Sequence, residues 1–580
     1  MPRFAALDLG SNALRLRIVE AHASGAGREQ LLLLPDQASP SFREVLSLRS
    51  PVRLGSEVFV TGKLASTSIG QACTALREFR EAMDQAKVDA YRATATSAVR
   101  EASNGQTLVE RARREAGIEL EVIEGVEEAR LIQLAVVRRL GLADKRALLV
   151  DVGGGSTELT LLDKGESAWA ISLPIGTVRL LETYLRGTKT VERGRQKLLF
   201  EGVDRALAEA VPQLRKLPFD IVVGTGGSVD TLVEICPLKG GHAGYPHAVE
   251  VPAMKSLLGK LFSMTTEQRR DAYGLRPDRA DTIVPAGTIF LRVAEAFKSS
   301  AIVAPGVGLK EGILEELVDK YFDRWDKESE TRTVIEACIR LGHRYGFDRA
   351  HGELVASFAA KLFDDMKSLH GFGERERLLL RAAAVLHDIG DYVRYDGHHK
   401  HSYYLIEHSD IMGLTPDERA IVANVARYHR KSPPDPSHPN FRDLDKEVRS
   451  KVRGLAAILR IADALDREHL GKVKSLHTEI EPSKRRLSLV VTGEEDRELE
   501  EWTVRAKSEL LRDVYDLDVQ IAPRPPSRPT ARPEAKDGKD GEDGKDGCDG
   551  KADARESGSM PASQRPSGKL PATEKSPANR

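Results

Sequence analysis

The sequence has few cysteines, no long apolar run and no excess of charge of either sign. Four cysteines occur among 580 residues, and they lie far apart, without the short spacing of a cysteine-ligated metal site. Isolated cysteines are typical of a reducing compartment, so we expect a cytoplasmic protein. The 87 Lys and Arg residues nearly equal the 88 Asp and Glu residues, which excludes a general attraction to nucleic acid or membranes. A polyanion could bind only through a local basic patch.

The lack of a long apolar run excludes a membrane-spanning helix, which needs about 20 consecutive apolar residues. The N-terminus enters a strand pattern at once, in place of a basic and then apolar leader. We therefore expect a soluble protein. A chain of 580 residues is too long for one hydrophobic core, and its length predicts three or four domains.

A glycine-rich segment between two apolar stretches is the most informative feature that is present. An apolar run at residues 147–150 meets Asp151, three glycines and a Ser-Thr pair, and polar and apolar residues then alternate from Glu158 to Leu161. This order predicts strand, tight turn and strand. Glycine lets backbone N–H groups point at an anion, and the carboxylate is suited to a hydrated divalent cation. The alternative is that the glycines only form a turn.

The N-terminus carries the same pattern about 140 residues earlier. Residues 3–20 place Asp8, Gly10, Ser11 and Asn12 between an apolar run and an alternating run. Two such turns, each preceded by an aspartate, could hold a phosphate group from both sides, with a cation between them. This arrangement resembles the actin, sugar-kinase and heat-shock-chaperone superfamily, in which each of two lobes contributes one hairpin. Without the second copy, an ordinary β-turn would be the preferred interpretation.

Strands and helices alternate between the two turns. We expect helices near residues 62–86 and 106–116 and strands near 88–95 and 119–124. Strands that alternate with helices of this length predict an α/β sheet.

Two charged features follow strand ends in the same region. Arg100 comes after the hydroxyl-rich strand end at 94–97, where an arginine can bind phosphate oxygens, although most exposed arginines are only solvated. Glu127 and Glu128 open an apolar helix, where the helix dipole alone favours carboxylates. A carboxylate placed beside a bound substrate could also act as general base for a water molecule.

Five motifs occur in one order along the N-terminal half. They are Asp-Leu-Gly-Ser-Asn at 8–12, Arg100, Gly-Val-Glu-Glu-Ala-Arg-Leu-Ile at 125–132, Asp-Val-Gly-Gly-Gly-Ser-Thr-Glu-Leu at 151–159 and Gly-Thr-Gly-Gly-Ser at 224–228. This set resembles the exopolyphosphatase and guanosine-pentaphosphate phosphohydrolase family over roughly residues 3–315. The resemblance implies a two-lobed actin-like (ribonuclease H-like) α/β phosphatase core. Lobe I would span 1–130 with a return segment near 300–316, and lobe II would span 131–300.

The resemblance also implies a role for each matching residue. Glu128 would activate the attacking water, Arg100 would bind phosphate, and Asp8 and Asp151 would orient Mg²⁺ or Mn²⁺ and the phosphate. Asp230 adds a negative charge near the third glycine turn that this scheme does not explain. The residues that would cradle phosphate or line its site are Ser11, Asn12, Gly153, Gly154, Ser156, Glu158, Gly226, Gly227 and Ser228.

From about residue 330 the apolar periodicity becomes helical, and histidines are concentrated there. His351, the pair His387-Asp388 and Asp463 resemble the metal quartet of HD domains in type and order, and such ligands suit a hydrolytic divalent metal. We predict an all-α HD-like domain at 330–471, with a second divalent metal. Long members of the family carry such a domain, often without these ligands, so a structural remnant is the alternative.

Two basic segments of this domain, which contain Lys400 and Arg430, match the family as well. The resemblance implies that they line a channel for long polyphosphate, and the alternative is a solvated charged face. A small α+β domain is expected at 472–522, and by analogy it could help to form a homodimer. Residues 523–580 have almost no apolar side chains, which predicts a disordered tail.

These features together predict an Mg²⁺-dependent exopolyphosphatase that releases orthophosphate from the ends of inorganic polyphosphate. Hydrolysis of guanosine pentaphosphate to the tetraphosphate uses the same chemistry, and the sequence does not separate the two substrates. Another interpretation is a non-catalytic, actin-like nucleotide-binding regulator, against which Glu128 and its motif argue. A last one is independent hydrolysis of a nucleotide at the HD-like site.

Overall fold

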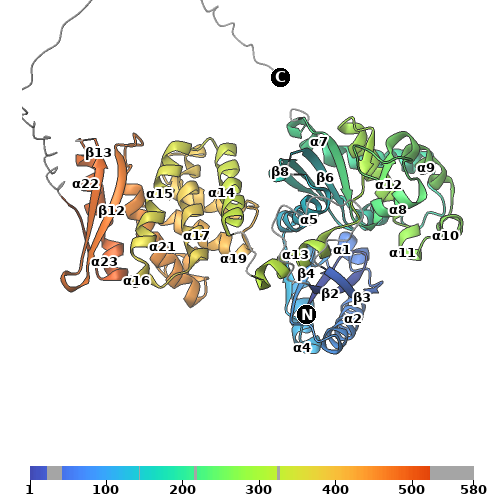
Figure 1. The fold of residues 1–580 in the computed structure, drawn as a ribbon, viewed down its shortest axis with the longest axis horizontal. Coiled ribbons are helices and arrows are strands. Elements are labelled where there is room, and N and C mark those ends of the chain that lie inside the picture. Colours follow the sequence, from blue (N-terminus) through green and yellow to red (C-terminus); the bar gives the residue numbers. More distant parts are fainter. Residues whose placement is uncertain (22–41, 143, 215–217, 323–326, 495, 523–580) are drawn as a thin grey trace, which may run out of the picture. The chain divides into compact units, whose positions relative to one another are not determined.

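The computed structural model describes residues 1–21, 42–142, 144–214, 218–322, 327–494 and 496–522 (Figure 1). They form an α/β part with two sheets, a helical part, and a small sheet with two helices near the end. The fold class expected from the sequence is therefore confirmed. The tail predicted at 523–580 lies outside the described residues.

The first sheet is built on the N-terminal hairpin. Its order is β3-β2-β1-β4-β5, in which β2 is antiparallel to β1 and β3, while β4 is parallel to β1 and β5. Alternate residues of β1 enter two different cores, with Leu7 and Leu9 in one and Phe4 and Ala6 in the other. The strands are β1 (Arg3–Leu9), β2 (Leu14–Ala21), β3 (Phe42–Ser50), β4 (Ala90–Ala95) and β5 (Leu120–Val122).

The second sheet repeats the order of the first. It reads β8-β7-β6-β9-β11-β10, with antiparallel β6-β7 and β7-β8 pairs and a parallel β6-β9 pair. Counted within its own sheet, each begins with the third, second, first and fourth strand, so the two glycine turns occupy equivalent positions. The strands are β6 (Arg146–Val152), β7 (Thr157–Asp163), β8 (Glu166–Leu173), β9 (Ile221–Thr225), β10 (Ala248–Glu250) and β11 (Ala301–Val303).

Helices connect the strands of both sheets. The helix expected near 62–86 begins only at Ser66, because Gly62 ends the preceding helix with φ +74°. The helices before β6 are α1 (Gly55–Thr61), α2 (Ser66–Gln85), α3 (Ser97–Glu101), α4 (Gly105–Ala116) and α5 (Gly125–Leu140). Those after β8 are α6 (Thr177–Leu180) with a π-helical turn (Leu181–Leu185), α7 (Arg193–Leu214), α8 (Gly227–Ile235), α9 (Val251–Ser263), α10 (Thr266–Tyr273), α11 (Pro277–Ala280), α12 (Ile283–Ala296) and α13 (Leu309–Tyr321).

Helices α5 and α13 join the two sheets through a shared core. Helix α5 packs against α13, β7 and β8, and α13 also packs against β1 and β4. Leu131 of α5 and Ile313 of α13 belong to the same apolar cluster as Phe4 of β1 and Leu149 of β6. This cluster fixes the first turn of α5, which carries Glu128, relative to both sheets.

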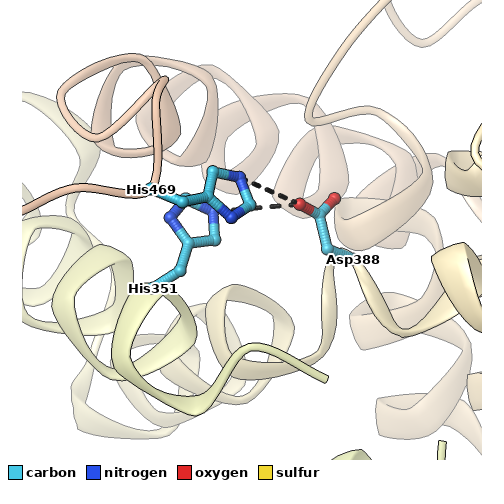
Figure 2. A group of neighbouring side chains, drawn as sticks. All are labelled: His351, Asp388 and His469. Atoms are coloured by element: carbon cyan, nitrogen blue, oxygen red, sulfur yellow. Dashed lines mark ion pairs between the residues drawn. The ribbon is translucent and has the colours of Figure 1, made fainter. Parts of the chain in front are cut away.

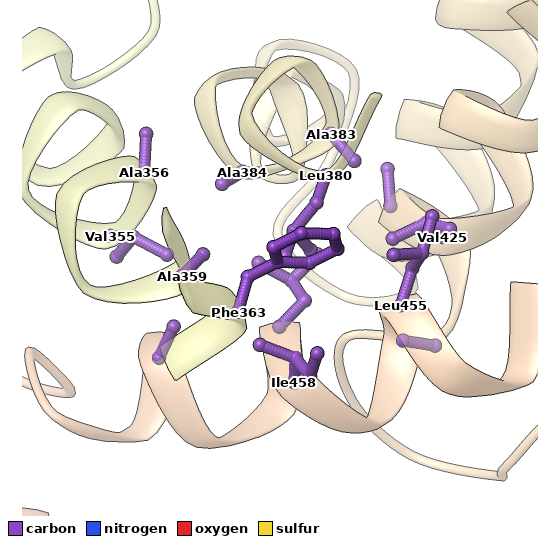
Figure 3. Close-up of a cluster of buried hydrophobic side chains, with 14 of the residues drawn as sticks. Val355, Ala356, Ala359, Phe363, Leu380, Ala383, Ala384, Val425, Leu455 and Ile458 are labelled. Atoms are coloured by element: carbon purple, nitrogen blue, oxygen red, sulfur yellow. The ribbon is translucent and has the colours of Figure 1, made fainter. Parts of the chain in front are cut away.

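The helical part shares one hydrophobic core with the small sheet and the helices that follow it. Phe363 of α15 lies among Leu380 of α17, Val425 of α19, and Leu455 and Ile458 of α21 (Figure 3). The elements are α14 (Lys327–Arg344), α15 (Arg349–Asp365), α16 (Lys367–His370), α17 (Glu374–Leu386), a 3-10 turn (Ile389–Tyr392), α18 (His398–Glu407), α19 (Pro416–Arg427), α20 (Pro439–Arg442) and α21 (Lys446–Ala464).

The last sheet follows the helical part in the order β12-β13-β14. Its strands are β12 (Val473–Glu481), β13 (Arg486–Gly493) and β14 (Asp518–Ile521). Between its last two strands the chain forms two helices, α22 (Glu498–Lys507) and α23 (Glu509–Tyr515), which meet at Ser508. Both pack against α21.

The two glycine turns lie against each other. A Cβ atom on Gly154 would lie 2.7 Å from Cβ of Ser11 and 3.3 Å from the backbone N of Asn12. On the other side, the carbonyl of Gly154 accepts a hydrogen bond from the backbone N of Val178 at 2.8 Å. Only a residue without a side chain fits at this point, so the close approach of the two hairpins depends on glycine.

Gly176 is the glycine whose replacement tests this packing. A Cβ atom there would lie 2.5 Å from both C and O of Gly154, and backbone atoms cannot give way as a side chain can. We expect Gly176→Ala to lower the free energy of unfolding by about 1–3 kcal/mol through overpacking. Gly70→Ala, inside α2 with no atom within 4 Å of its added Cβ, should raise it by about 0.5–1 kcal/mol. Denaturant unfolding of both variants checks the expectation, and equal effects would contradict it.

Candidate functional site

Three buried carboxylates come together where β6, β7 and α5 meet. Asp151 is the next-to-last residue of β6 and pairs in register with Glu158 of β7, and Glu128 stands in the first turn of α5. Asp151 is 9%, Glu158 2% and Glu128 6% exposed. One oxygen of each lies within 4.8 Å of one oxygen of the other two. Three acids from two of the five motifs thus form one cluster.

Some oxygens of this cluster have partners and others do not. The hydroxyl of Thr225 donates to Oδ1 of Asp151 at 2.5 Å, and that of Ser172 donates to Oε1 of Glu158 at 2.8 Å. Oε2 of Glu128 and Oε2 of Glu158 are buried, with no hydrogen-bond partner in the described part of the chain. A buried carboxylate oxygen without a partner is costly. The donor set therefore fits a hydrated divalent cation.

The surroundings raise the pKa of all three acids. Burial raises the pKa of Glu128 well above its ordinary value, and repulsion by Glu158 and Asp151 raises it further. Burial raises the pKa of Glu158 to about 7, with repulsion by Asp151 as a further cause. Burial raises the pKa of Asp151 to about 6, although the Thr225 hydroxyl opposes the shift. The charge of Arg100 lowers the pKa of Glu128 but does not outweigh burial.

The two adjacent glutamates have opposite environments. Burial opposes ionisation of Glu127, but Arg130 and Arg92 outweigh it and lower its pKa to about 2. Its carboxylate accepts hydrogen bonds from Arg130 Nε at 2.7 Å and Arg92 Nη2 at 3.1 Å. Arg92 and Arg130 also bind Glu316 of α13. Glu127 thus belongs to an ion-pair network, whereas Glu128 faces the carboxylate cluster.

The hydroxyl groups and aspartate of the first turn complete the surroundings. Asp8 is 5% exposed, and its Oδ2 lies 3.0 Å from Nη1 of Arg15. The hydroxyls of Ser11 and Ser97 are hydrogen-bonded at 2.9 Å, which links the first turn to the start of α3. In the second turn, the N–H of Gly153 donates to O of Ser156 at 3.0 Å and closes the turn.

Two other predicted phosphate ligands are engaged within the protein. Arg100 Nη1 donates to the carbonyl of Ile123 at 2.6 Å. The amide of Asn12 donates to Asp278 Oδ2 at 3.3 Å and accepts from Nε of Arg53 at 2.8 Å. The atoms engaged in these bonds would have to exchange them before they could bind a phosphate oxygen.

The third glycine turn lies beside the cluster. Gly226 has φ +87°, and a Cβ atom on it would lie 3.5 Å from Oδ1 of Asp151. Gly227 lies against Arg279, whose guanidinium donates to the hydroxyl of Ser228. Asp230, unexplained by the sequence, has its pKa raised to about 6 by burial and by repulsion from Glu234.

Arg279 and its neighbours were not found from the sequence. Arg279 is 6% exposed, and burial lowers its pKa to about 10, with repulsion by Arg15 as a further cause. Arg53 Nη1 lies 2.8 Å from Oδ2 of Asp281, and Arg49 pairs with Asp278. None of these residues stands in a glycine motif, so no local pattern in the sequence indicated that they lie beside the site.

The predicted quartet of the helical part also comes together. Nε2 of His351 and Nε2 of His387 lie 3.2 Å apart. Oδ1 of Asp463 lies 3.5 Å from Nε2 of His387, and so does Oδ2 of Asp388. His469, which sequence reasoning missed, stacks on His351 and points its Nε2 at Asp388 at 3.8 Å (Figure 2). The metal role of the quartet stays a prediction.

The two basic residues predicted for a polyphosphate channel have different surroundings. Lys400 is exposed on α18. Arg430 is half-buried, and its Nη1 lies 3.1 Å from Nε2 of His398, close to the quartet. Arg430 therefore belongs to the histidine-rich site as well as to the basic surface.

The raised pKa of Glu158 predicts a pH-dependent stability. A folded-state pKa of about 7, above the ordinary 4.5, means that the folded protein binds more protons between these values. Stability is therefore lost as pH rises through this window. Without divalent cations, Glu158→Gln should raise the apparent Tm by several degrees at pH 8 and by much less at pH 5.

Thermal unfolding in chelator at both pH values measures this difference, and added Mg²⁺ should reduce it at pH 8 because the cation stabilises the ionised wild type. Glu498→Gln, an acid on the surface near the start of α22, serves as the control and should change little at either pH. The same Tm difference at pH 5 and pH 8 would show that Glu158 is ionised at both.

Relatives of known name match most of the chain. Residues 35–321 match the Ppx/GppA phosphatase family, and residues 333–511 match Ppx/GppA phosphatase, domain III. A guanosine-5'-triphosphate,3'-diphosphate pyrophosphatase from Vibrio campbellii is 28% identical over 432 residues, which are 74% of this chain and 81% of the relative. One from Aeromonas hydrophila is 26% identical over 468 residues, 80% of this chain and 87% of the relative.

Solved structures match the N-terminal half. An exopolyphosphatase from Cytophaga hutchinsonii is 26% identical, with a TM-score of 0.49, and covers 55% of this chain and 98% of its own. Among the described residues, no helix is both long enough and apolar enough to cross a membrane. Because the two family models match consecutive parts of the chain, this protein belongs to the Ppx/GppA phosphatase family.

Proposed function

We propose that this protein hydrolyses the terminal phosphoanhydride bond of inorganic polyphosphate and releases orthophosphate. One observation carries the proposal. Glu128 is buried beside Asp151 and Glu158, close to two glycine turns that lie against each other, and its Oε2 has no partner among the described residues. A carboxylate in this position can take a proton from a water molecule that attacks a phosphoryl group held by the turns.

Each residue of the site has a role in this proposal. Glu128 is the general base, and its raised pKa makes it a stronger base than an ordinary carboxylate. Asp8 and Asp151 would hold a hydrated Mg²⁺ or Mn²⁺, which would withdraw negative charge from the phosphoryl oxygens. Arg100 leaves the Ile123 carbonyl to bind the same oxygens. The cradle consists of Ser11, Asn12, Gly153, Gly154, Ser156, Gly226, Gly227 and Ser228, and Glu158 lines the site beside Glu128 and Asp151.

Guanosine pentaphosphate is the second candidate substrate, favoured by relatives that are named as pyrophosphatases of this nucleotide. Both substrates present a terminal phosphoryl group to the same base. The two substrates differ in the rest of the molecule, behind the terminal phosphoryl group, and this part would lie away from Glu128. A non-catalytic, actin-like regulator is disfavoured, because the chain belongs to a phosphatase family.

Glu128→Gln keeps the shape of the side chain and removes the base. We expect substrate binding to persist while kcat falls by about 10²–10⁴, the contribution usual for a general base. Phosphate release from long polyphosphate and from guanosine pentaphosphate, measured side by side with Mg²⁺, checks this and shows which substrate has the higher kcat/KM. Glu127→Gln is the matched control. The carboxylate of Glu127 is bound by Arg92 and Arg130, so this change should affect stability more than turnover.

Near-normal turnover in Glu128→Gln would exclude the proposed role for Glu128. If the wild type released phosphate from neither substrate, the alternative of a non-catalytic regulator would be favoured. Release that survives Glu128→Ala would place hydrolysis elsewhere, with the helical part as the first region to test.

We further propose that basic residues of the helical part bind long polyphosphate. Lys400→Ala should raise KM for long chains more than for short ones, and rising salt should shrink the difference because exposed charges are screened. Arg430→Ala should act in the same direction. Lys367→Ala removes an exposed lysine of the same region and should leave chain-length preference unchanged. Equal KM changes for long and short chains would count against the channel.

A homodimer and a cytoplasmic location stay predictions of the sequence. Light scattering of the purified chain checks the first, and fractionation of cells checks the second.

A further inference from the structure

Four buried histidines of the helical part present the same nitrogen to one another. The Nδ1 of His387 lies 2.7 Å from the carbonyl of Ala384, and the Nδ1 of His429 lies 2.6 Å from the carbonyl of Ala426. A carbonyl only accepts hydrogen bonds, so each Nδ1 carries the proton. In the neutral ring, Nε2 is then left with a lone pair that points inward.

The other two histidines are oriented by carboxylates. Nδ1 of His351 lies 2.8 Å from Asp466 Oδ2, and Nδ1 of His398 lies 2.6 Å from Asp391 Oδ1. These carboxylates accept from Nδ1 and again leave Nε2 as the acceptor. In His398 this nitrogen faces Nη1 of Arg430 at 3.1 Å, a contact that a metal ion would displace. Metal-binding histidines typically have their second nitrogen fixed in this way.

The inward nitrogens form two close pairs. Nε2 of His351 and Nε2 of His387 are 3.2 Å apart, and Nε2 of His398 and Nε2 of His429 are 3.3 Å apart. Two lone pairs at such a distance repel each other unless a metal ion binds both or one ring carries a second proton and donates it to the other. Nitrogens that bind one tetrahedral or octahedral ion at about 2.0–2.1 Å lie about 2.9–3.4 Å apart. Both pairs have that separation.

Asp388 stands between the two pairs, with one oxygen on each side. Its Oδ2 lies 3.5 Å from Nε2 of His387, and its Oδ1 lies 3.1 Å from Nε2 of His398 and 3.4 Å from Nε2 of His429. Oδ1 is buried and accepts no hydrogen bond from the described residues. A carboxylate in this place can bridge two metal ions.

We propose that the helical part binds two divalent metal ions, bridged by Asp388. His351, His387 and Asp463 would hold the first ion, and His398 and His429 the second. Imidazole and carboxylate donors suit Mn²⁺, Fe²⁺, Co²⁺ or Zn²⁺. This extends the four-residue site predicted from the sequence, which held one ion and did not include His398 or His429.

A pocket beside the second pair indicates the ligand. It has a volume of about 200 Å³, and Asp388, His398 and His429 line it together with Arg430, Lys431 and Arg467. Cationic side chains around two metal ions form a site for an anion with several oxygens. The ligand class we propose is a phosphoryl group, either free phosphate or a phosphate ester.

Lys507 provides the competing explanation. Its ammonium pairs with Asp463 and lines the same pocket. If this charge alone balances the aspartates, the cluster needs no metal. The two explanations predict opposite results when metal is counted.

The experiment uses the full-length protein, stripped with chelator and titrated with Mn²⁺. Bound Mn²⁺ per chain and the electron paramagnetic resonance spectrum are measured together. We expect the double variants His351→Ala/His387→Ala and His398→Ala/His429→Ala each to lose at least one Mn²⁺ and the spin-coupled signal of a metal pair. The control is the double variant His408→Ala/His477→Ala, which removes two exposed histidines. It should keep its Mn²⁺ count and the spin-coupled signal. Any Mn²⁺ bound in the phosphatase core is common to all four proteins and cancels.

Asp388→Asn, a conservative change, covers the case in which a double variant fails to fold. It should abolish the coupled signal while the circular dichroism spectrum stays that of the wild type. Inorganic phosphate and glycerol 2-phosphate, added to the Mn²⁺-loaded wild type, should both change the coupled signal if the pocket takes phosphoryl groups. If only free phosphate does so, the ligand is the inorganic ion.

Three results would overturn the proposal. They are an Mn²⁺ count that is equal in all proteins, a wild type that shows only isolated Mn²⁺, and Mn²⁺ binding in the helical part that requires Lys507→Ala. The last result would identify Lys507 as the permanent counter-charge. A coupled signal that phosphate and its ester both leave unchanged would keep the metal pair and exclude the phosphoryl ligand.

Discussion

The burial of three carboxylates in one place is the constraint on which the phosphatase core depends. Glu128, Asp151 and Glu158 repel one another in a low-dielectric environment, and each would be more stable in water or protonated. The antiparallel register of β6 and β7 holds Asp151 opposite Glu158. Helix α5 holds Glu128 against them, because its apolar side packs into the core shared by both sheets. The packing of the fold therefore compensates the repulsion among the three carboxylates. A cation bound together with a phosphate group would relieve this repulsion.

The helical part meets the same problem with different residues. Its aspartates are surrounded by histidines, whose outer nitrogens are fixed by carbonyls or carboxylates and whose inner nitrogens converge. The polar cluster rests on an apolar core made by α15, α17, α19 and α21, which gives the side chains little freedom to rearrange. In both parts, groups that would separate in water are held together by packing that is remote from them.

Local patterns predicted the elements well and the partners of individual side chains poorly. Each glycine turn is encoded by a short segment, so the hairpins around Asp8 and Asp151 could be placed from the sequence. The family resemblance singled out Glu128, but the ion-pair network around Glu127 could not be predicted, because it depends on Arg92 and Glu316, which lie far away in the chain. Strand β3 was not expected, and neither was the division at Ser508. His398 and His429 stand in segments that seemed only basic, and their place beside Asp388 follows from how α18 and α19 pack.

The ion pairs beside the N-terminal turn have a consequence for how molecules enter and leave. Arg49 and Arg53 come from the first sheet and its following loop. They pair with Asp278 of α11 and with Asp281, the residue after this helix, in the other half of the core. These ion pairs connect the two halves of the core. A polyanion bound at these guanidinium groups would compete with the aspartates, so its binding would weaken the ion pairs between the two halves.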